Sequence, residues 1–356
     1  MRRRTRKALL QVVLFVAALV LVLFVTSSQP SNKAFAWDRV QYKTSSKTLP
    51  EPRGICPGLA ETLKPALVVA RVEADGETDW LDPLSEKYHL CIYTADAPRD
   101  KTSKYLQVPA NRGHEAMTYL TFVIDNYANI PASGAVFVHG SRWAWHNDSP
   151  DYDNAALLAA LDVPAALEPW GYHNLRCDWS LSTCYPSTKP QGSLDNSAQA
   201  LLAPWDSRAV SDAALPSALS NIFSGNVPLS RSDAVRSQCC AQFVVARSQI
   251  WQHSKEEYVA LRQWLLDSDG APRDDRIAGR ILSYVWHILF IDQADAHNPS
   301  PEGVDLAQLN TQACPRADQC YCRLYGRCGL EGCTTAGSCN GQYVLPPKLK
   351  VECPLR

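Results

Sequence analysis

The stretch Ala66-Leu-Val-Val-Ala70 is a short, uninterrupted apolar run, and it begins the part of the chain that decides the fold class. A run of this length is typical of a buried strand. Two more strands are predicted at Tyr88-His-Leu-Cys-Ile-Tyr93 and at Ala135-Val-Phe-Val138. Between them, residues 114–127 have helical spacing, with one apolar stripe at Met117, Leu120, Ile124 and Tyr127.

This order of strand, strand, helix and strand predicts an α/β domain, with a mixed central sheet and flanking helices, rather than a sandwich or a bundle. Regular patterns return further on. Ala241-Gln-Phe-Val-Val245 is strand-like, and Ser254-Lys-Glu-Glu257 is a capping box that opens a helix through Leu266. A second helix is predicted over residues 276–290, whereas residues 150–235 are loop-rich and show no clear element.

The N-terminus has the pattern of a signal anchor. A cationic cluster in residues 1–8 precedes the apolar segment LLQVVLFVAALVLVLFVT, residues 9–26. As a helix this segment is roughly 27 Å long, enough for a thin bilayer, and the preceding positive charge keeps the N-terminus cytoplasmic. The alternative is a cleaved signal peptide, but its apolar region usually spans about 7–15 residues. The one small-x-small site, Ala34-Phe35-Ala36, also lies late.

Cysteine content agrees with a translocated domain. The chain has 13 cysteines, and seven of them fall between Cys314 and Cys353. Such a cluster predicts disulfides, because the paired Cys-x2-Cys spacings of zinc sites are absent. The adjacent Cys239 and Cys240 are expected to bridge elsewhere, with Cys177 and Cys184 as plausible partners. An odd total leaves at least one thiol free or bridged to another chain.

Composition divides the chain into five parts. After the tail (1–8) and the transmembrane anchor (9–26) comes a stem rich in Ser, Pro, Lys and Thr (27–60). A lumenal α/β domain (61–300) and a small cysteine-rich appendage (301–356) follow. The formal net charge is −1, and no long basic run lies outside the N-terminus, so nucleic acid is not an expected partner.

Several segments occur in the order of a known family. They are VVARVEADGETDWL (68–81), VPANRGHEAMTYLTFVIDNY (108–127), VFVHGSRWAWHNDSPDYDN (136–154), GYHNLRCDW (171–179), CCAQFVVARSQI (239–250) and YVWHILF (284–290). Over about residues 66–328 the chain resembles the fungal-type domain of unknown function 3431. That resemblance implies family membership and no particular activity.

A second resemblance is to glycosyltransferases of the A-type fold. The strand, the Asn-x-Gly at a helix start and the next strand are similar to the nucleotide-sugar-binding half of those enzymes. The segment 239–250 is similar to a strand that lines acceptor sites in some of them. In those enzymes a carboxylate motif after the third strand holds a divalent metal on the diphosphate. Here His139-Gly140-Ser141 takes that place, so no metal ligand is assigned.

Polar and aromatic residues crowd the segment after the third strand, where open α/β sheets bind ligands. We expect His139, His146 and Asp148 to be catalytic, with His146 and a nearby carboxylate acting as a base or holding a divalent ion. Arg142 is expected to pair with phosphate oxygens. The faces of Trp143 and Trp145 are suited to a sugar ring. The alternative is a polar surface loop.

A second cluster opens the predicted helix at Asn111-Arg112-Gly113-His114-Glu115, where free backbone N–H groups favour anions. A plain capping turn explains it equally well. Arg71, beside Glu73, Asp75 and Asp79, is placed to contact a base or ribose. The predicted donor-binding set is therefore Arg71, Asn111, Arg112, Gly113 and Arg142. It requires residues 111–115 and 139–153 to share one cleft.

These patterns predict a membrane-anchored, glycosyltransferase-like enzyme of the secretory pathway, in the Golgi or at the cell surface. It would act on a nucleotide-sugar and on a cell-wall or glycoconjugate acceptor. Two alternatives stay open. One is a non-catalytic surface or matrix protein with a degenerate α/β domain. The other is a lumenal metal-dependent hydrolase built on His146 and Asp148.

Overall fold

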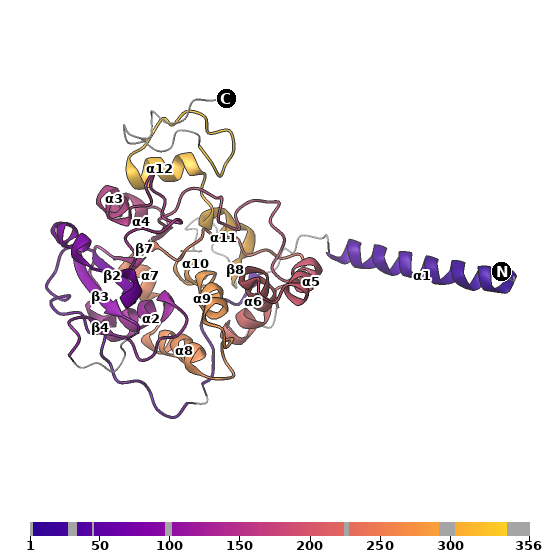
Figure 1. The fold of residues 1–356 in the computed structure, drawn as a ribbon, viewed down its shortest axis with the longest axis horizontal. Coiled ribbons are helices and arrows are strands. Elements are labelled where there is room, and N and C mark those ends of the chain that lie inside the picture. The colour runs from indigo at the N-terminus through magenta and orange to yellow at the C-terminus, as the bar shows by residue number, and fades with distance from the viewer. Residues whose placement is uncertain are drawn as a thin grey trace.

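The computed structural model describes residues 3–27, 34–44, 46–96, 102–223, 228–291 and 303–339. A long N-terminal helix, α1 (Arg3–Ser27), precedes an α/β domain that holds the rest of the described chain (Figure 1). Within the part of the chain that the structure describes, no helix is both long enough and apolar enough to cross a bilayer.

The core of the domain is a six-stranded mixed sheet in the order β4-β3-β2-β5-β7-β6. Strands β4, β3, β2 and β5 run parallel, and β7 is antiparallel to both β5 and β6. The strand bounds are β2 (Ala66–Arg71), β3 (His89–Thr94), β4 (Leu106–Gln107), β5 (Ala135–His139), β6 (Tyr172–Asn174) and β7 (Phe243–Val245). The predicted fold class, a mixed sheet with flanking helices, is confirmed.

The strand register places the carboxyl ends of β2, β3 and β5 at one edge. Ala70 of β2 pairs with Tyr93 of β3 on one side and with His139 of β5 on the other. After β2 the chain continues to β3 on one side, and it returns later to β5 on the opposite side. The strand order therefore reverses between β2 and β5, which is the topological switch point where open α/β sheets bind their ligands.

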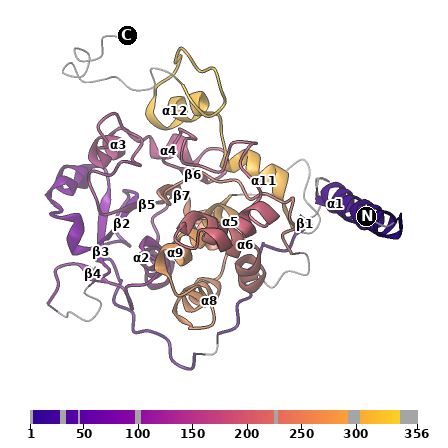
Figure 2. The ribbon, with the colours of Figure 1, turned by 45° about the vertical axis from the view of Figure 1, so that its right-hand side comes forward.

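Helices cover both faces of the sheet (Figure 2). Phe137 and Phe243 point into the larger core, against α2 (Glu115–Asp125), α6 (Ser207–Phe223), α8 (Lys255–Leu266), α9 (Asp275–Ser283) and α10 (Trp286–Phe290). Val136, Val138 and Val244 point into the smaller core, against α3 (Asn154–Ala160), α4 (Val163–Leu167) and α12 (Ala317–Tyr325). Burial on both faces explains why these strands are apolar runs.

The remaining elements are short. They are β1 (Ala34–Phe35), which pairs with β8 (Val304–Asp305), the helices α5 (Leu194–Leu202), α7 (Arg247–Trp251) and α11 (Leu306–Ala313), and the 3-10 turns η1 (Glu73–Asp75), η2 (Asp79–Glu86) and η3 (Tyr127–Asn129). The helix predicted over residues 276–290 is in fact α9 followed by α10. The break lies at Tyr284, whose hydroxyl donates to buried Asp212 of α6 over 2.8 Å.

The described part of residues 27–60, predicted to be a stem, packs against the domain. Phe35 and Trp37 are buried in the larger core. The backbone N–H of Val40 donates to Glu257 over 3.0 Å, and Cys56 forms a disulfide with Cys91 of β3. The composition of this stretch, rich in Ser, Lys and Thr, predicts an exposed stem. It packs against the domain because burying the rings of Phe35 and Trp37 stabilises the folded chain.

Six disulfides pair 12 of the 13 cysteines: Cys56–Cys91, Cys177–Cys320, Cys184–Cys314, Cys239–Cys240, Cys322–Cys328 and Cys333–Cys339. The disulfide character of the C-terminal cluster is confirmed, and two bridges tie it to the middle of the chain. The expected partners of Cys239 and Cys240 were wrong, because these adjacent cysteines pair with each other. Cys353 lies outside the described residues.

Candidate functional site

A groove of about 430 Å³ lies at the topological switch point. One wall comes from the loop after β2 and the other from the loop after β5. Eight residues line this switch-point groove: Ala74, Asp75, Glu77, Asp79, Trp80, Ser141, Arg142 and Trp143. The groove therefore joins two segments that are separated by more than 60 residues in the sequence.

Asp75 connects the two walls. One carboxylate oxygen accepts the N–H of Val72 over 2.9 Å, which closes the turn after β2. The other accepts the hydroxyl of Ser141, which follows β5. Gly140 permits this close approach, because a Cβ there would lie 2.4 Å from the Cβ of Arg71. Residue 140 has to be glycine for the two loops to meet.

Arg71 lies beneath the first wall and does not line the groove. It is buried, its Nη2 donates to the carbonyl of Gly76 over 3.2 Å, and its guanidinium lies 4.5 Å from the centre of the Tyr105 ring. Arg71 was predicted to bind a donor. Its contacts hold the loop after β2, and donor binding by Arg71 stays a prediction.

Arg142 lines the groove, but its charge is already paired. Its Nε and Nη2 donate to the two carboxylate oxygens of Asp153 over 3.0 and 2.9 Å. Burial alone would raise the pKa of Asp153, but hydrogen bonds from Arg142 and from the Ala155 N–H lower it below its ordinary value. The guanidinium also stacks 4.5 Å from the centre of the Trp143 ring. Arg142 thus orients Trp143, which is 56% exposed.

His139 and His146 form a pair beside the groove. Their Nε2 atoms are 3.0 Å apart, and the Nε2 of His139 is 2.9 Å from the Oδ1 of Asn147. Burial, as the largest cause, together with the neighbouring His139 and Arg176 lowers the pKa of His146 to about 4. Burial also lowers the pKa of His139. Both imidazoles are therefore neutral at neutral pH. The structure brings these two predicted site residues together.

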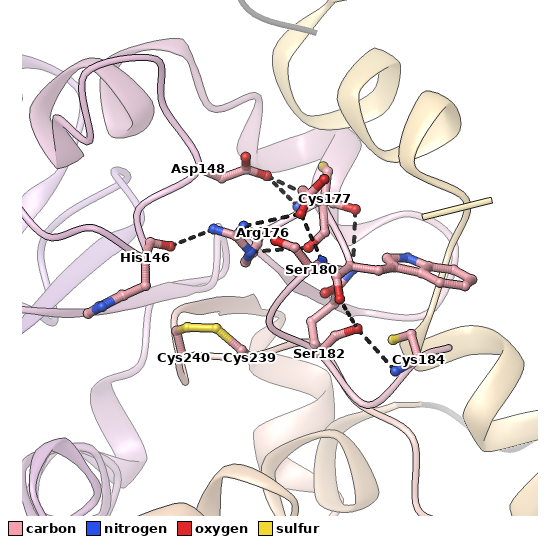
Figure 3. A network of polar contacts seen from close by, with 12 residues as sticks. His146, Asp148, Arg176, Cys177, Ser180, Ser182, Cys184, Cys239 and Cys240 are labelled. Carbon is pink, nitrogen blue, oxygen red and sulfur yellow. Dashed lines mark hydrogen bonds and ion pairs between the residues drawn. A yellow bond between two sulfur atoms is a disulfide. The ribbon is translucent and has the colours of Figure 1, made fainter. Parts of the chain in front are cut away.

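Asp148 belongs to a different network. Its Oδ2 accepts the N–H groups of Cys177 and Asp178 over 2.7 and 3.2 Å, and both carboxylate oxygens lie within 3.0 Å of the Tyr321 hydroxyl. Figure 3 shows the carboxylate directed toward Cys177, away from the ring of His146. Asp148 is buried. The predicted partnership of His146 with Asp148 is not formed, because the carboxylate is occupied by structural donors.

The turn at residues 111–115 packs against α8 and α9. The guanidinium of Arg112 donates to the carbonyls of Leu265, Pro272 and Arg273 and to the carboxylate of Asp275. A Cβ at Gly113 would lie 2.8 Å from Leu265, and Asn111 is exposed. The cap of α2 is His114 rather than Asn111.

No residue of this turn lines the switch-point groove. Residues 111–115 and 139–153 were predicted to share one cleft. Only the second segment contributes to the switch-point groove. The reason is that the donors of Arg112 are taken up by the chain between α8 and α9, a contact between segments about 160 residues apart.

A family model described as "Protein of unknown function (DUF3431)" matches residues 67–323, more than half of the chain. The chain belongs to this DUF3431 family. Neither a search of curated proteins nor a search of solved structures finds a match. The matched part of the DUF3431 chain begins in β2 and ends in α12, so it contains both walls of the groove and the histidine pair.

The disulfides of this DUF3431 chain indicate an extracellular or secretory location. Bridges persist in oxidising compartments and are rare where glutathione and thioredoxin keep thiols reduced. Two of them, Cys177–Cys320 and Cys184–Cys314, join segments 143 and 130 residues apart and are part of the domain itself.

Several residues that build the DUF3431 site are not among the predicted site residues. Glu77 and Trp80 line the groove, and Asn147 and Gln242 hold the histidine pair. Glu77 and Trp80 can be identified from the strand order, because ligands bind between the loops after β2 and β5 in such a sheet. No local pattern identifies Gln242, which lies 95 residues from its partner Asn147.

Proposed function

We propose that this DUF3431 protein is a glycosyltransferase-like enzyme of the secretory pathway that binds carbohydrate in the switch-point groove. The observation that carries the proposal is the position of the groove, between the loops that follow β2 and β5. Ligands of open α/β sheets bind at this position. The domain is known only as one of unknown function, so the proposal rests on the chemistry of the walls.

The walls combine two kinds of group that bind sugars, namely hydrogen-bonding polar groups and exposed aromatic rings. Glu77 and Asp79 supply carboxylate oxygens that can accept hydrogen bonds from ligand hydroxyl groups, whereas both oxygens of Asp75 already accept from Val72 and Ser141. Trp143 exposes one side of its indole, and the neighbouring Trp145 is 69% exposed, which is unusual for such large apolar rings. The buried Nε1–H of Trp80 has no acceptor among the described residues and can donate to a ligand oxygen.

Charge favours hydroxyl groups over a bare diphosphate in this groove. Three carboxylates line it, and its one arginine, Arg142, is held by Asp153. A diphosphate would meet net negative charge there, whereas carboxylates commonly bind ribose hydroxyls. We therefore propose that the groove binds the sugar or ribose part of a ligand.

A non-catalytic carbohydrate-binding protein is the second candidate. It is favoured by the pairing of Arg142 and by the structural contacts of Asp148, because neither residue is then free for chemistry. A hydrolase built on His146 and Asp148 loses its support for the same reason.

Thermal unfolding of the full-length protein separates the candidates. UDP- and GDP-sugars, with and without Mn²⁺, are compared with free oligosaccharides. A ligand at 100 times its Kd stabilises a protein by about 2.7 kcal/mol, a rise of several degrees in midpoint. We expect a nucleotide-sugar to give this rise and Trp143→Ala to abolish it. As a matched control, Trp205→Ala, with a side chain 78% exposed outside the groove, keeps the rise.

A rise with oligosaccharides alone supports the binding protein instead. No rise with either kind of ligand, or an equal rise in Trp143→Ala, contradicts both candidates.

We also infer that the apolar segment 9–26 anchors the protein at a membrane, with the domain on the lumenal or extracellular side, although no described helix meets the length and apolar character of a span. Large apolar side chains of α1 between Leu9 and Val22 are exposed, which is costly in water. Arg6 and Lys7 precede them, and positive charge ahead of a first span favours a cytoplasmic N-terminus.

A further inference from the structure

We propose that His139 and His146, together with Asn147, bind a divalent transition-metal ion. The proposal does not depend on a carbohydrate in the groove. Two imidazole Nε2 atoms and one amide oxygen meet at this point, at the end of β5 and in the loop that follows it. Imidazole is a common ligand for zinc, iron, copper and nickel.

The two distances from the Nε2 of His139 to the other proposed ligand atoms fit one ion. The two Nε2 atoms are 3.0 Å apart, and the Oδ1 of Asn147 is 2.9 Å from the Nε2 of His139. Two ligands at right angles on an ion, as in octahedral or square-planar coordination, lie about 3 Å apart when the bonds are about 2.1 Å. Hydrogen bonds have the same lengths. The orientation of the two imidazole rings distinguishes a hydrogen bond from a shared ion.

The ring orientation agrees with a shared ion. An imidazole Nε2 lies about 1.1 Å from its ring centre, so a collinear hydrogen bond of this length would separate the centres by about 5.2 Å. The measured separation is 4.7 Å, with an interplanar angle of 71°. The ring axes are therefore bent away from the line between the two Nε2 atoms, as in two imidazoles on one ion.

The amide of Asn147 is fixed with its oxygen toward the histidines. Its Nδ2 donates to the carbonyls of Arg142 and Tyr152 over 3.1 and 2.9 Å, so Oδ1 must face the other way. Gln242 donates to this oxygen over 3.1 Å, and Asn154 in turn donates to Gln242 over 3.0 Å. Such outer contacts orient metal ligands and are typical of metal sites.

The site has open coordination positions. Among the residues that the structure describes, no third His, Cys, Asp or Glu lies within 4.8 Å of both Nε2 atoms. The one group that meets this criterion, Cys56, His89 and Cys91, contains a disulfide and offers no thiolate. Both ligand histidines are half-buried and so remain accessible from solvent. Three protein ligands leave positions for water or for a substrate oxygen, as in catalytic metal sites.

Metal binding to the full-length protein, made without an oligohistidine tag and freed of metal with a chelator, tests this assignment. Co²⁺ is the probe, because its visible absorption reports nitrogen ligands, and calorimetry gives the stoichiometry. We expect one equivalent to bind. His146→Gln and His139→Ala should each weaken binding at least 10-fold, and Gln242→Met should weaken it by about 10- to 100-fold, because Asn147 loses its orientation.

His89→Gln is the control, since His89 is also half-buried but lies on β3 and contacts the carbonyl of Pro57. It should bind Co²⁺ like the wild type. Unfolding midpoints of the metal-free proteins identify any variant that fails to fold, and His146→Gln is the mildest change. Equal Co²⁺ affinity in wild type, His139→Ala and His146→Gln, or no stoichiometric binding, would overturn the proposal. Neither result affects the nucleotide-sugar experiment, which includes metal-free samples.

Discussion

At the scale of single residues, Asp148 illustrates how one carboxylate can link three segments. It accepts two backbone N–H groups from the loop that follows β6 and the hydroxyl of Tyr321 on α12. Hydrogen bonds to a buried charged acceptor are about twice as strong as neutral ones. Asp148 therefore contributes to the stability of the histidine-bearing loop, whereas its catalytic role stays a prediction.

Replacing Asp148 with Asn tests that role. The amide oxygen can still accept the two N–H groups, but the charge is lost and the Tyr321 hydroxyl must turn from donor to acceptor, so the free energy of unfolding in urea should fall by about 2 kcal/mol. Tyr321→Phe should cost about 1.5 kcal/mol. Asp195→Asn, in an exposed pair with Lys189, should change stability by less than about 0.5 kcal/mol. Wild-type stability with loss of ligand binding alone would instead make Asp148 a site residue.

The sequence predicts the polar cluster after β5, but it cannot say which way each side chain points. Asn147 and Asp148 are neighbours, yet Asn147 faces the histidines and Asp148 faces α12. The deciding partner of Asp148 is Tyr321, 173 residues away. Likewise, only the fold reveals that Asp153 already holds Arg142. Contacts at such separations leave no local pattern.

At the scale of elements, long apolar patterns were sufficient to predict the main strands and helices. The strands β2, β3 and β5 and the helices α2 and α8 all follow predicted segments within a few residues. The strands β4 and β6 were missed because they have only two and three residues, too few for periodicity. The strand predicted at residues 241–245 starts later, at Phe243, because Cys240 and Ala241 adopt positive φ angles that end extended structure.

Helix α1 is the element that we propose as a membrane anchor. If it anchors the chain, replacing Leu14 and Leu19 with Arg should release the protein, since each Arg at the centre of a span costs about 3 kcal/mol. Alkaline carbonate extraction of cell membranes measures this. The wild type should stay in the pellet and the double variant should move to the supernatant. Finding both proteins in the supernatant rules out the anchor.

At the scale of the whole molecule, covalent bridges support the contacts between distant segments. Cys177–Cys320 and Cys184–Cys314 attach α11 and α12 to the middle of the chain, whereas Cys322–Cys328 closes a loop of six residues. In the chain-entropy description, a bridge stabilises more when it closes a longer loop.

Paired Cys-to-Ser variants compare these bridges. Removing Cys177–Cys320 and Cys184–Cys314 together, which frees the whole long loop, should lower the free energy of unfolding by at least roughly 5 kcal/mol, and removing Cys322–Cys328 by roughly 2 kcal/mol. Urea unfolding under non-reducing conditions measures both. Equal losses would show that loop length does not govern stability here, and that local packing around the sulfur atoms does.

The span of these two bridges has a consequence for biosynthesis. Cys177 and Cys184 leave the ribosome long before Cys314 and Cys320, so their thiols wait, unpaired, while more than a hundred further residues are made. During that interval they are exposed to exchange with one another and with neighbouring chains. Once the bridges have formed, a protease that nicks the chain between positions 184 and 314 releases no fragment, because the pieces stay covalently joined.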